Sequence, residues 1–155
     1  MDSDIIKIQT EAFDAGAYIN QLTLADSSMG AVASFIGVMR DTNEGDEVTT
    51  MTLEHYPGMT EKALHAIIEQ ARHRWQLGQC ILLHRVGPLL PSDQIVLVAV
   101  SSSHRKQAFQ ACEFIIDYLK NEAPFWKKET TSQGERWVEE RKQDKDALKQ
   151  WNESD

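Results

Sequence analysis

The chain has 155 residues, of which 41% are hydrophobic and 26% are charged, a composition typical of one ordinary globular domain. Its formal net charge of −8 argues against a general nucleic-acid binder, because such proteins usually carry a basic excess. The start of the chain has no signal-peptide pattern, and no apolar run approaches the roughly 20 residues that a membrane span needs. We therefore expect a cytoplasmic protein.

The first third of the sequence predicts strands and one helix. Residues 5–8 predict a short edge-like strand, and residues 14–24 predict a helix. The apolar run 31–39 predicts a largely buried strand. The polar, glycine-containing stretch 40–46 is expected to be a mobile loop, and the alternating stretch 48–56 predicts the next strand.

The middle of the chain predicts a helix followed by two apolar strands. Thr60 is expected to cap a helix that runs to about Trp75, because apolar side chains recur at helical spacing between them. Residues 80–86 and 95–100 are rich in apolar and β-branched side chains, which is typical of strands.

The last third of the chain predicts one more helix and two short strands. Ser103 is expected to cap the helix, which ends before Pro124 because the residue before a proline disfavours helical geometry. Short strands are expected at 125–130 and 136–138, around a glycine turn.

These elements indicate a single domain over residues 1–155, because no repeat or linker interrupts them. Strands and helices mix without strict alternation, so the sequence predicts an α+β fold. From about residue 139 to 155 the chain is a polar tail, in which Trp151 is the one side chain expected to anchor it.

Neither the cysteines nor the histidines indicate a metal or cofactor. Cys80 and Cys112 are too few for a disulfide scaffold or a zinc module, and we expect both to be core residues without an activated thiolate. His65, Glu69 and His73 share a helix face, for which a solvated surface is the favoured interpretation, so no metal site is expected. Glycine motifs for phosphates or dinucleotides are absent, and no cofactor is expected.

The strongest signal for chemistry is a pair of lysines on either side of an Ala-Pro-Phe-Trp turn. Lys120 falls in the last turn of the predicted helix, and Lys127 follows the change of direction at Pro124. Such a turn can bring both amines to one space, where lost hydration and a second cation lower the pKa of a lysine. The amine then becomes a plausible acid, base or nucleophile. Two solvated lysines at a helix C-terminus explain the same pattern.

A second signal is the segment 101–106, Ser-Ser-Ser-His-Arg-Lys, at a predicted strand end and helix start. Its hydroxyls, backbone N–H groups and cationic side chains suit a phosphate, although a simple helix cap explains them equally well. Arg40 is a weaker candidate at the end of its strand. His104 lies 16 residues before Lys120 on one helix, a separation of roughly 24 Å. We therefore expect a symmetric dimer to bring His104 and Arg105 of one subunit to the lysines of the other.

Four motifs together resemble one known family. They are 53–59 (Leu-Glu-His-Tyr-Pro-Gly-Met), 103–105 (Ser-His-Arg), 123–129 (Ala-Pro-Phe-Trp-Lys-Lys-Glu) and 134–138 (Gly-Glu-Arg-Trp-Val). In order and spacing the set resembles the large, catalytic subunits of molybdopterin synthase, the MoaE family. The likeness extends from about Gly30 to Val138.

This resemblance implies a sulfurtransferase of molybdenum cofactor biosynthesis. Members of the family insert two sulfurs into cyclic pyranopterin monophosphate to make the dithiolene of molybdopterin. The sulfur arrives as the C-terminal thiocarboxylate of a small ubiquitin-like partner, whose Gly-Gly tail enters the large subunit. A homodimer of large subunits with two small subunits forms a heterotetramer. The implied fold is an α/β hammerhead-type single domain with a mixed, largely antiparallel sheet.

The resemblance also implies roles for individual residues. Lys120 would polarise the thiocarboxylate carbonyl or take part in acyl chemistry, and Lys127 would assist proton transfers or stabilise charge on the pterin. The implied substrate-binding residues are Val38, Met39, Arg40, His104, Arg105, Lys128 and Glu129. Arg40 would hold the phosphate and pterin together with His104 and Arg105 of the neighbouring subunit.

Two other functions stay open from the residues themselves. A non-catalytic module could use the same basic residues to bind an anion, and a hydrolase or acyltransferase could act on small phosphorylated compounds. Only the sulfurtransferase needs a small partner that ends in Gly-Gly, so co-purification of such a partner would separate these functions.

Overall fold

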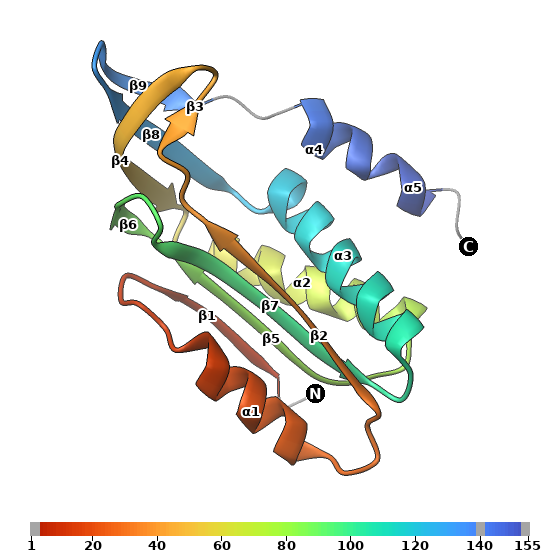
Figure 1. The fold of residues 1–155 in the computed structure, drawn as a ribbon. Helices are drawn as coiled ribbons and strands as arrows, with labels where there is room; N and C mark the ends of the chain where they lie inside the picture. The colour runs from red at the N-terminus through yellow and green to blue at the C-terminus, as the bar shows by residue number, and fades with distance from the viewer. Residues whose placement is uncertain (1–3, 139–141, 153–155) are drawn as a thin grey trace.

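Two β-sheets that meet end to end form the framework of the protein (Figure 1). The computed structural model describes residues 4–138 and 142–152. The first sheet has the strand order β1 (Ile5–Gln9), β5 (Leu77–Arg85), β7 (Gln94–Ser102) and β2 (Ala31–Val38). The second has the order β3 (Thr42–Asn43), β4 (Asp46–His55), β8 (Phe125–Thr131) and β9 (Gly134–Val138), and β6 (Gly87–Leu89) pairs with β4. The helices are α1 (Ala15–Ala25), α2 (Met59–Arg74), α3 (Arg105–Glu122), α4 (Lys142–Ala147) and α5 (Lys149–Asn152).

The strand pairing confirms the predicted α+β class. All described pairs are antiparallel except β1 and β5, which run parallel. A parallel pair needs a long crossover connection, and here α1, β2, β4 and α2 all lie between the two strands in the chain. The result is a mixed, largely antiparallel arrangement.

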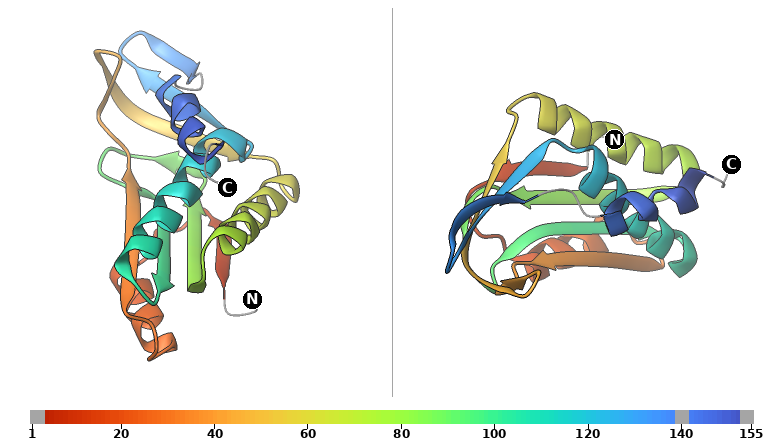
Figure 2. Two further views of the ribbon diagram at one scale, coloured as in Figure 1. Left: turned by 90° about the vertical axis from the view of Figure 1, so that its right-hand side faces the viewer. Right: turned by 90° about the horizontal axis from the view of Figure 1, so that it is seen from above.

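β5 and β7 form the centre of the core because both of their faces are covered. Side chains alternate between the faces of a strand, so Leu82 and Val98 pack in the cluster that includes α2 and α3, whereas Ile81 and Leu97 pack with α1. Figure 2 shows α1 and α2 on opposite sides of this sheet. A strand buried on both faces has apolar residues at nearly every position in the sequence, which makes these two strands predictable.

β2 is an edge strand, and the prediction of a largely buried strand was wrong. Among the described strands it pairs only with β7, and Phe35 and Val38 are 38% and 48% exposed. Only Ala33 of this strand is buried. An apolar run does not reveal whether a strand has one neighbour or two, and that difference decides its burial.

The stretch predicted as a mobile loop, 40–46, folds into the β3–β4 hairpin instead. Thr42 pairs with Glu47, and Asn43 pairs with Asp46. The turn residues Glu44 and Gly45 both have positive φ angles, of 53° and 83°, as a tight two-residue hairpin requires. The glycine that suggested mobility therefore serves a defined turn.

The helix caps differ from those predicted. The N-cap of α2 is Gly58, whose backbone N–H donates to the Glu61 carboxylate at 2.9 Å, and the N-cap of α3 is His104, not Ser103. Thr60 is fully buried: its hydroxyl accepts from the backbone N–H of residue 56 at 2.9 Å and donates to the Pro124 carbonyl at 3.0 Å. Thr60 therefore joins the start of α2 to the turn after α3.

The C-terminal segment packs along α3 through Trp151, which confirms the predicted anchor. Its ring is buried against Trp75 and Phe114, and its indole N–H donates to Asp117 at 2.8 Å. Residues 139–141 and 153–155 of the predicted tail lie outside the described residues.

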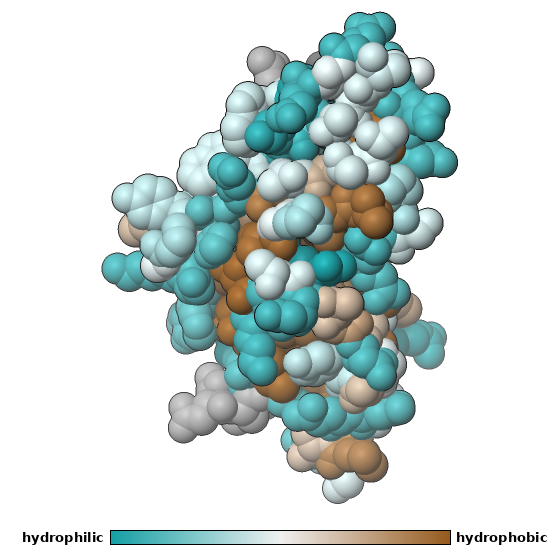
Figure 3. All heavy atoms as spheres, turned by 90° about the vertical axis from the view of Figure 1, so that its left-hand side faces the viewer, coloured by the Kyte–Doolittle hydropathy of each residue, from teal (hydrophilic) through white to brown (hydrophobic). Residues whose placement is uncertain are grey.

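The surface varies along the length of the molecule. Figure 3 shows the face that carries β1, β4 and β6, where hydrophobic side chains gather near the middle and the end formed by the second sheet is hydrophilic. Scattered apolar residues such as Leu24 and Leu90 are ordinary on a globular surface. Within residues 4–138 and 142–152, no helix combines the length and apolar character needed to cross a membrane.

Candidate active site

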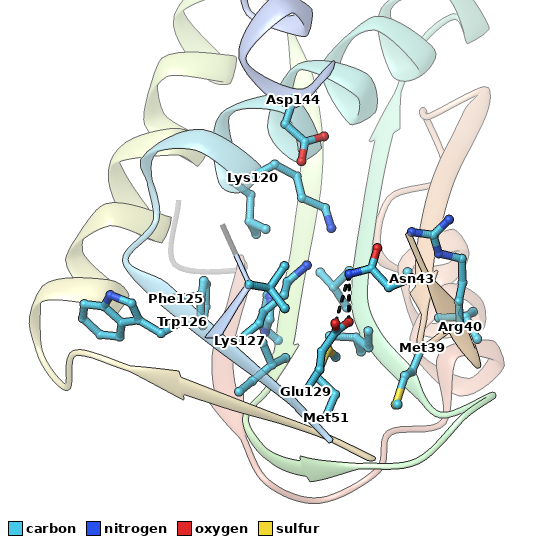
Figure 4. A pocket seen from close by; sticks show the side chains of 18 of the residues that line it. Met39, Arg40, Asn43, Met51, Lys120, Phe125, Trp126, Lys127, Glu129 and Asp144 are labelled. Carbon is cyan, nitrogen blue, oxygen red and sulfur yellow. Dashed lines mark hydrogen bonds between the residues drawn. The ribbon is translucent and has the colours of Figure 1, made fainter. Parts of the chain in front are cut away.

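A cavity of about 650 Å³ opens where the two sheets meet, beside the end of α3 (Figure 4). Its polar lining comes from distant parts of the chain and includes Arg40, Asn43, His84, Lys120, Lys127, Glu129 and Asp144. Apolar walls are supplied by Met39, Met51, Leu53, Leu119 and Phe125. A hollow with apolar walls and a few convergent polar groups is the usual form of a small-molecule site.

α3 and β8 carry the two predicted lysines into this cavity. α3 ends at Glu122 because Pro124 cannot continue the helix, and the chain turns directly into β8. Alternation along β8 places Phe125 and Lys127 on one face. Figure 4 shows the amines of Lys120 and Lys127 directed toward the same space from the two elements. The structure thus brings the lysine pair together.

The cavity lowers the pKa of both lysines. Burial is the main cause for Lys127, followed by the charge of Lys120, and the Lys127 pKa falls to about 8. Lys120 keeps contact with solvent, but protein atoms crowd its amine enough for burial to lower its pKa too; Asp144 opposes this effect and Arg40 adds to it. A fraction of Lys127 is therefore uncharged near neutral pH, as proton transfer requires.

Asp144, on α4, is a carboxylate partner of the lysine pair that the sequence did not reveal. Its charge raises the pKa of Lys120 and of Lys127, and Figure 4 shows it next to Lys120. The Asn121 amide donates to the backbone carbonyl of Asp144 at 2.6 Å, which ties α4 to the end of α3. Nothing in a polar tail distinguishes this aspartate from its charged neighbours.

Glu129 fastens the β3–β4 hairpin to the wall of the cavity. Its buried carboxylate accepts from the Asn43 side-chain amide at 3.0 and 3.1 Å and from Arg136 Nε at 3.3 Å. Arg136 also donates to Asp46 at 2.8 Å, on the other arm of the hairpin. Arg40 lies two residues before this hairpin, so the network holds the segment that follows Arg40.

The end of β2 supplies the opposite wall. Val38, Met39 and Arg40 all line the cavity; Met39 is buried, whereas Val38 and Arg40 are exposed. Figure 4 shows Arg40 across the cavity from Lys120 and Lys127. Cations thus approach the hollow from two sides.

Three predicted contacts lie away from the cavity of the same chain. His104 and Arg105 are exposed at the start of α3, at the other end from Lys120. Lys128 does not line the cavity, since alternation turns it to the other face of β8, where its amine pairs with Glu135 at 3.1 Å. One chain therefore does not bring all the predicted residues to one site.

The remaining sequence candidates have structural roles. The Ser101 hydroxyl accepts from the backbone N–H of Gln79, and the Ser102 hydroxyl donates to the Gln76 carbonyl, both at 3.0 Å, so these buried hydroxyls are engaged by the fold. Both cysteines are buried as predicted, and burial raises the pKa of each thiol to about 12. A thiol of that pKa forms almost no thiolate at neutral pH.

An α+β domain whose cavity gathers cations around a lysine of lowered pKa has the features of an enzyme, because such a lysine can transfer protons. The chain is a member of the MoaE family: the family model described as MoaE protein matches residues 8–122, well over half of its length.

Relatives and solved structures agree with this membership. The molybdopterin synthase catalytic subunit of Ralstonia nicotianae is 59% identical over 146 residues, covering 94% of this chain and 83% of the relative. The molybdopterin biosynthesis MoaE protein of Burkholderia ambifaria superposes with a TM-score of 0.83 at 52% identity, covering 97% of this chain and 99% of that one. The Escherichia coli molybdopterin synthase catalytic subunit is 51% identical over 146 residues, covering 94% of this chain and 97% of the relative.

Proposed function

We infer that this chain is the catalytic subunit of a molybdopterin synthase, an enzyme of molybdenum cofactor biosynthesis. It transfers sulfur from the C-terminal thiocarboxylate of a small partner to cyclic pyranopterin monophosphate and so forms the dithiolene of molybdopterin. Membership of the MoaE family and the names of the relatives support this function. The observation that carries it is the cavity in which Lys120, Lys127 and Arg40 converge.

Lys120 is the residue that we propose acts on the sulfur donor, the thiocarboxylate of the small partner. It keeps contact with solvent, so an extended Gly-Gly tail entering from the surface would reach its amine readily. The ammonium form would polarise the thiocarboxylate carbonyl while the sulfur forms a bond to a pterin carbon. In exchange, a carbon–oxygen bond at that pterin carbon breaks, and the departing oxygen takes up a proton. Water then adds to the acyl carbon and the acyl–sulfur bond breaks, which leaves the sulfur on the pterin and a carboxylate on the partner.

Lys127 is the residue assigned to proton transfer. With a pKa of about 8, its amine exchanges a proton near neutral pH at little energetic cost. Val38, Met39 and Glu129 would bound the pterin, and Arg40 would hold its phosphate as a hydrogen-bonding cation.

A second copy of this chain, in a dimer, completes the proposed phosphate site. His104 and Arg105 lie at the far end of α3 from Lys120, so they would act on the cavity of the neighbouring copy. Lys128, which faces away from its own cavity, would reach substrate only after its pair with Glu135 opens.

The assembly proposed is a cytoplasmic heterotetramer of two large and two small subunits. The relatives bear the name catalytic subunit, which implies at least one other kind of chain in the enzyme. Residues 1–155 would act as one catalytic domain, with the small ubiquitin-like partner as the source of sulfur and no resident cofactor.

The test is conversion of the pterin precursor by the purified chain and a thiocarboxylated partner. We expect Lys120→Ala and Lys127→Ala each to lower the rate by about 10²-fold or more, the usual scale for removal of an acid–base group. Lys62→Ala, an exposed lysine on α2, is the matched control and should convert precursor at the wild-type rate.

Full activity in both cavity variants would refute the assigned roles. Reaction without the thiocarboxylated partner would favour a hydrolase or acyltransferase, and binding without conversion would favour an anion-binding module.

A further inference from the structure

His84 lies in the cavity but has no part in the chemistry assigned above. It is near the end of β5, is 5% exposed, and lines the same cavity as the lysine pair. The titratable groups that face it are Lys120 from α3, Lys127 from β8 and His55 from β4. The lysine ammonium groups only donate hydrogen bonds, so it matters which ring nitrogen of His84 can accept one.

One ring nitrogen of His84 is committed to the backbone. Nδ1 lies 2.7 Å from the carbonyl oxygen of Arg85. Because a carbonyl oxygen only accepts, Nδ1 must carry the hydrogen, and Nε2 is left with a lone pair. The side chain makes no other hydrogen bond within the described part of the chain, so Nε2 is free to accept from a molecule in the cavity that His84 lines.

The ring is also held in a fixed orientation and stays uncharged. It stacks on Phe125, with centroids 3.9 Å apart and planes 16° from parallel. Burial, above all, lowers the pKa of His84 to about 3, and the charges of Lys120 and Lys127 add to the effect. Nε2 therefore remains an acceptor throughout the physiological pH range.

The two carboxylates of the cavity, Glu129 and Asp144, already face donors or cations. Glu129 accepts from Asn43 and Arg136, and Asp144 balances the charge of the lysines. A rigid acceptor that lines a ligand cavity and has no protein partner is placed to accept a hydrogen bond from a donor on the ligand. Cations can hold a phosphate, but they cannot accept from an N–H group.

We propose that His84 is a substrate-positioning residue whose Nε2 accepts a hydrogen bond from a ring N–H or amino group of the bound pterin. The inference rests on the pterin substrate of the proposed function. Two kinds of group would then recognise the substrate: cations hold the phosphate, and the neutral imidazole selects a heterocycle with an N–H donor.

Three substitutions separate the functions of the ring. His84→Asn keeps a donor for the Arg85 carbonyl but removes Nε2, His84→Phe keeps only the stack on Phe125, and His84→Gln can place an amide oxygen near the position of Nε2. Each full-length variant is checked by thermal unfolding and then titrated with cyclic pyranopterin monophosphate and, separately, with inorganic phosphate.

We expect His84→Asn and His84→Phe to bind the pterin about tenfold more weakly, which is the effect of losing about 1.4 kcal/mol, and to bind inorganic phosphate as the wild type does. In steady state the loss should appear in KM and not in kcat, and His84→Gln should stay within about threefold of the wild type.

Wild-type affinity for the pterin in the folded Asn and Phe variants would overturn the proposal. Equal losses for the pterin and for phosphate, or a folded Gln variant as weak as the Phe variant, would also overturn it, because they indicate a purely structural ring. A wild-type chain that binds phosphate but no pterin would overturn the proposed function itself.

Discussion

At the scale of single residues, the chemistry of the site depends on how the protein sets the charge of two lysines. Burial removes hydration from both amines and lowers the pKa of each; the charge of Lys120 also lowers the pKa of Lys127, and the charge of Arg40 lowers the pKa of both. Asp144 acts in the other direction, because a carboxylate stabilises the ammonium form of both lysines. The protonation state of the pair is therefore a balance between the cavity and one side chain of α4.

Asp144→Asn should shift this balance. Without the carboxylate the ammonium forms lose a stabilising partner, so the pKa of Lys127 should fall below its value of about 8 and that of Lys120 should fall as well. The limb of the pH–rate profile that reports Lys127 should move to lower pH, and an NMR titration of the lysine amines measures the same change.

Asp146→Asn is the control for this substitution. Asp146 is on the same helix but pairs with Lys149 at 3.1 Å, and neither lysine of the cavity depends on it. An unchanged pH profile in Asp144→Asn, or an equal shift in both variants, would contradict the role of Asp144.

At the scale of elements, the site depends on the junction where α3 turns into β8. Pro124 ends the helix, but a proline alone does not specify the direction in which the chain leaves. That direction is held by the Thr60 hydroxyl, which bonds the Pro124 carbonyl at 3.0 Å, and by the ladder between β8 and β4. The start of α2 thus helps to position Lys127.

Thr60→Val should loosen this junction at nearly constant volume. The substitution leaves the backbone N–H of residue 56 and the Pro124 carbonyl without their partner, and we expect a loss of about 1–3 kcal/mol in the free energy of unfolding. Denaturant unfolding measures this value. Thr60→Ser keeps the hydroxyl and should retain more of the stability; equal stability of the Val variant and the wild type would disprove the bridging role.

At the scale of the whole molecule, the proposed site, with His104 and Arg105 as members, requires two copies of the chain to share it. α3 separates the lysine end from His104 and Arg105, and the length of a helix cannot be altered by side-chain motion. In our proposal, a symmetric dimer would resolve this separation by placing the start of one α3 at the cavity of the other chain.

Mixed dimers test this arrangement. His104→Ala and Lys120→Ala should each be inactive or nearly so as pure dimers. In a dimer of one chain of each kind, one of the two shared sites has both native residues, so we expect about half of the wild-type activity per mixed dimer. Co-expression with two affinity tags isolates the mixed species. If all residues act within one chain, the mixed dimer will be as weak as its parents.

Much of the fold was predictable because its elements have strong local signals. The central strands β5 and β7 are continuous apolar runs, and Pro124 ends a helix. The predictions were wrong where packing against distant segments decides whether a segment is buried or forms a strand. β2 is apolar but lies at an edge, and the hairpin after Arg40 is held by Glu129 and Arg136 from far along the chain.

By itself, the sequence determined the α+β class, the family resemblance and the lysine pair, since each depends on local pattern. The proposal that two copies share the site also comes from the sequence, because it depends on the rise of a helix. Only the tertiary structure decided the partners of that pair. Asp144 and His84 lie 24 residues after and 36 residues before Lys120, and no local pattern marks either one. They become part of the site because chain folding brings α4 and β5 to one cavity, where burial and electrostatic interactions act through space and not along the sequence.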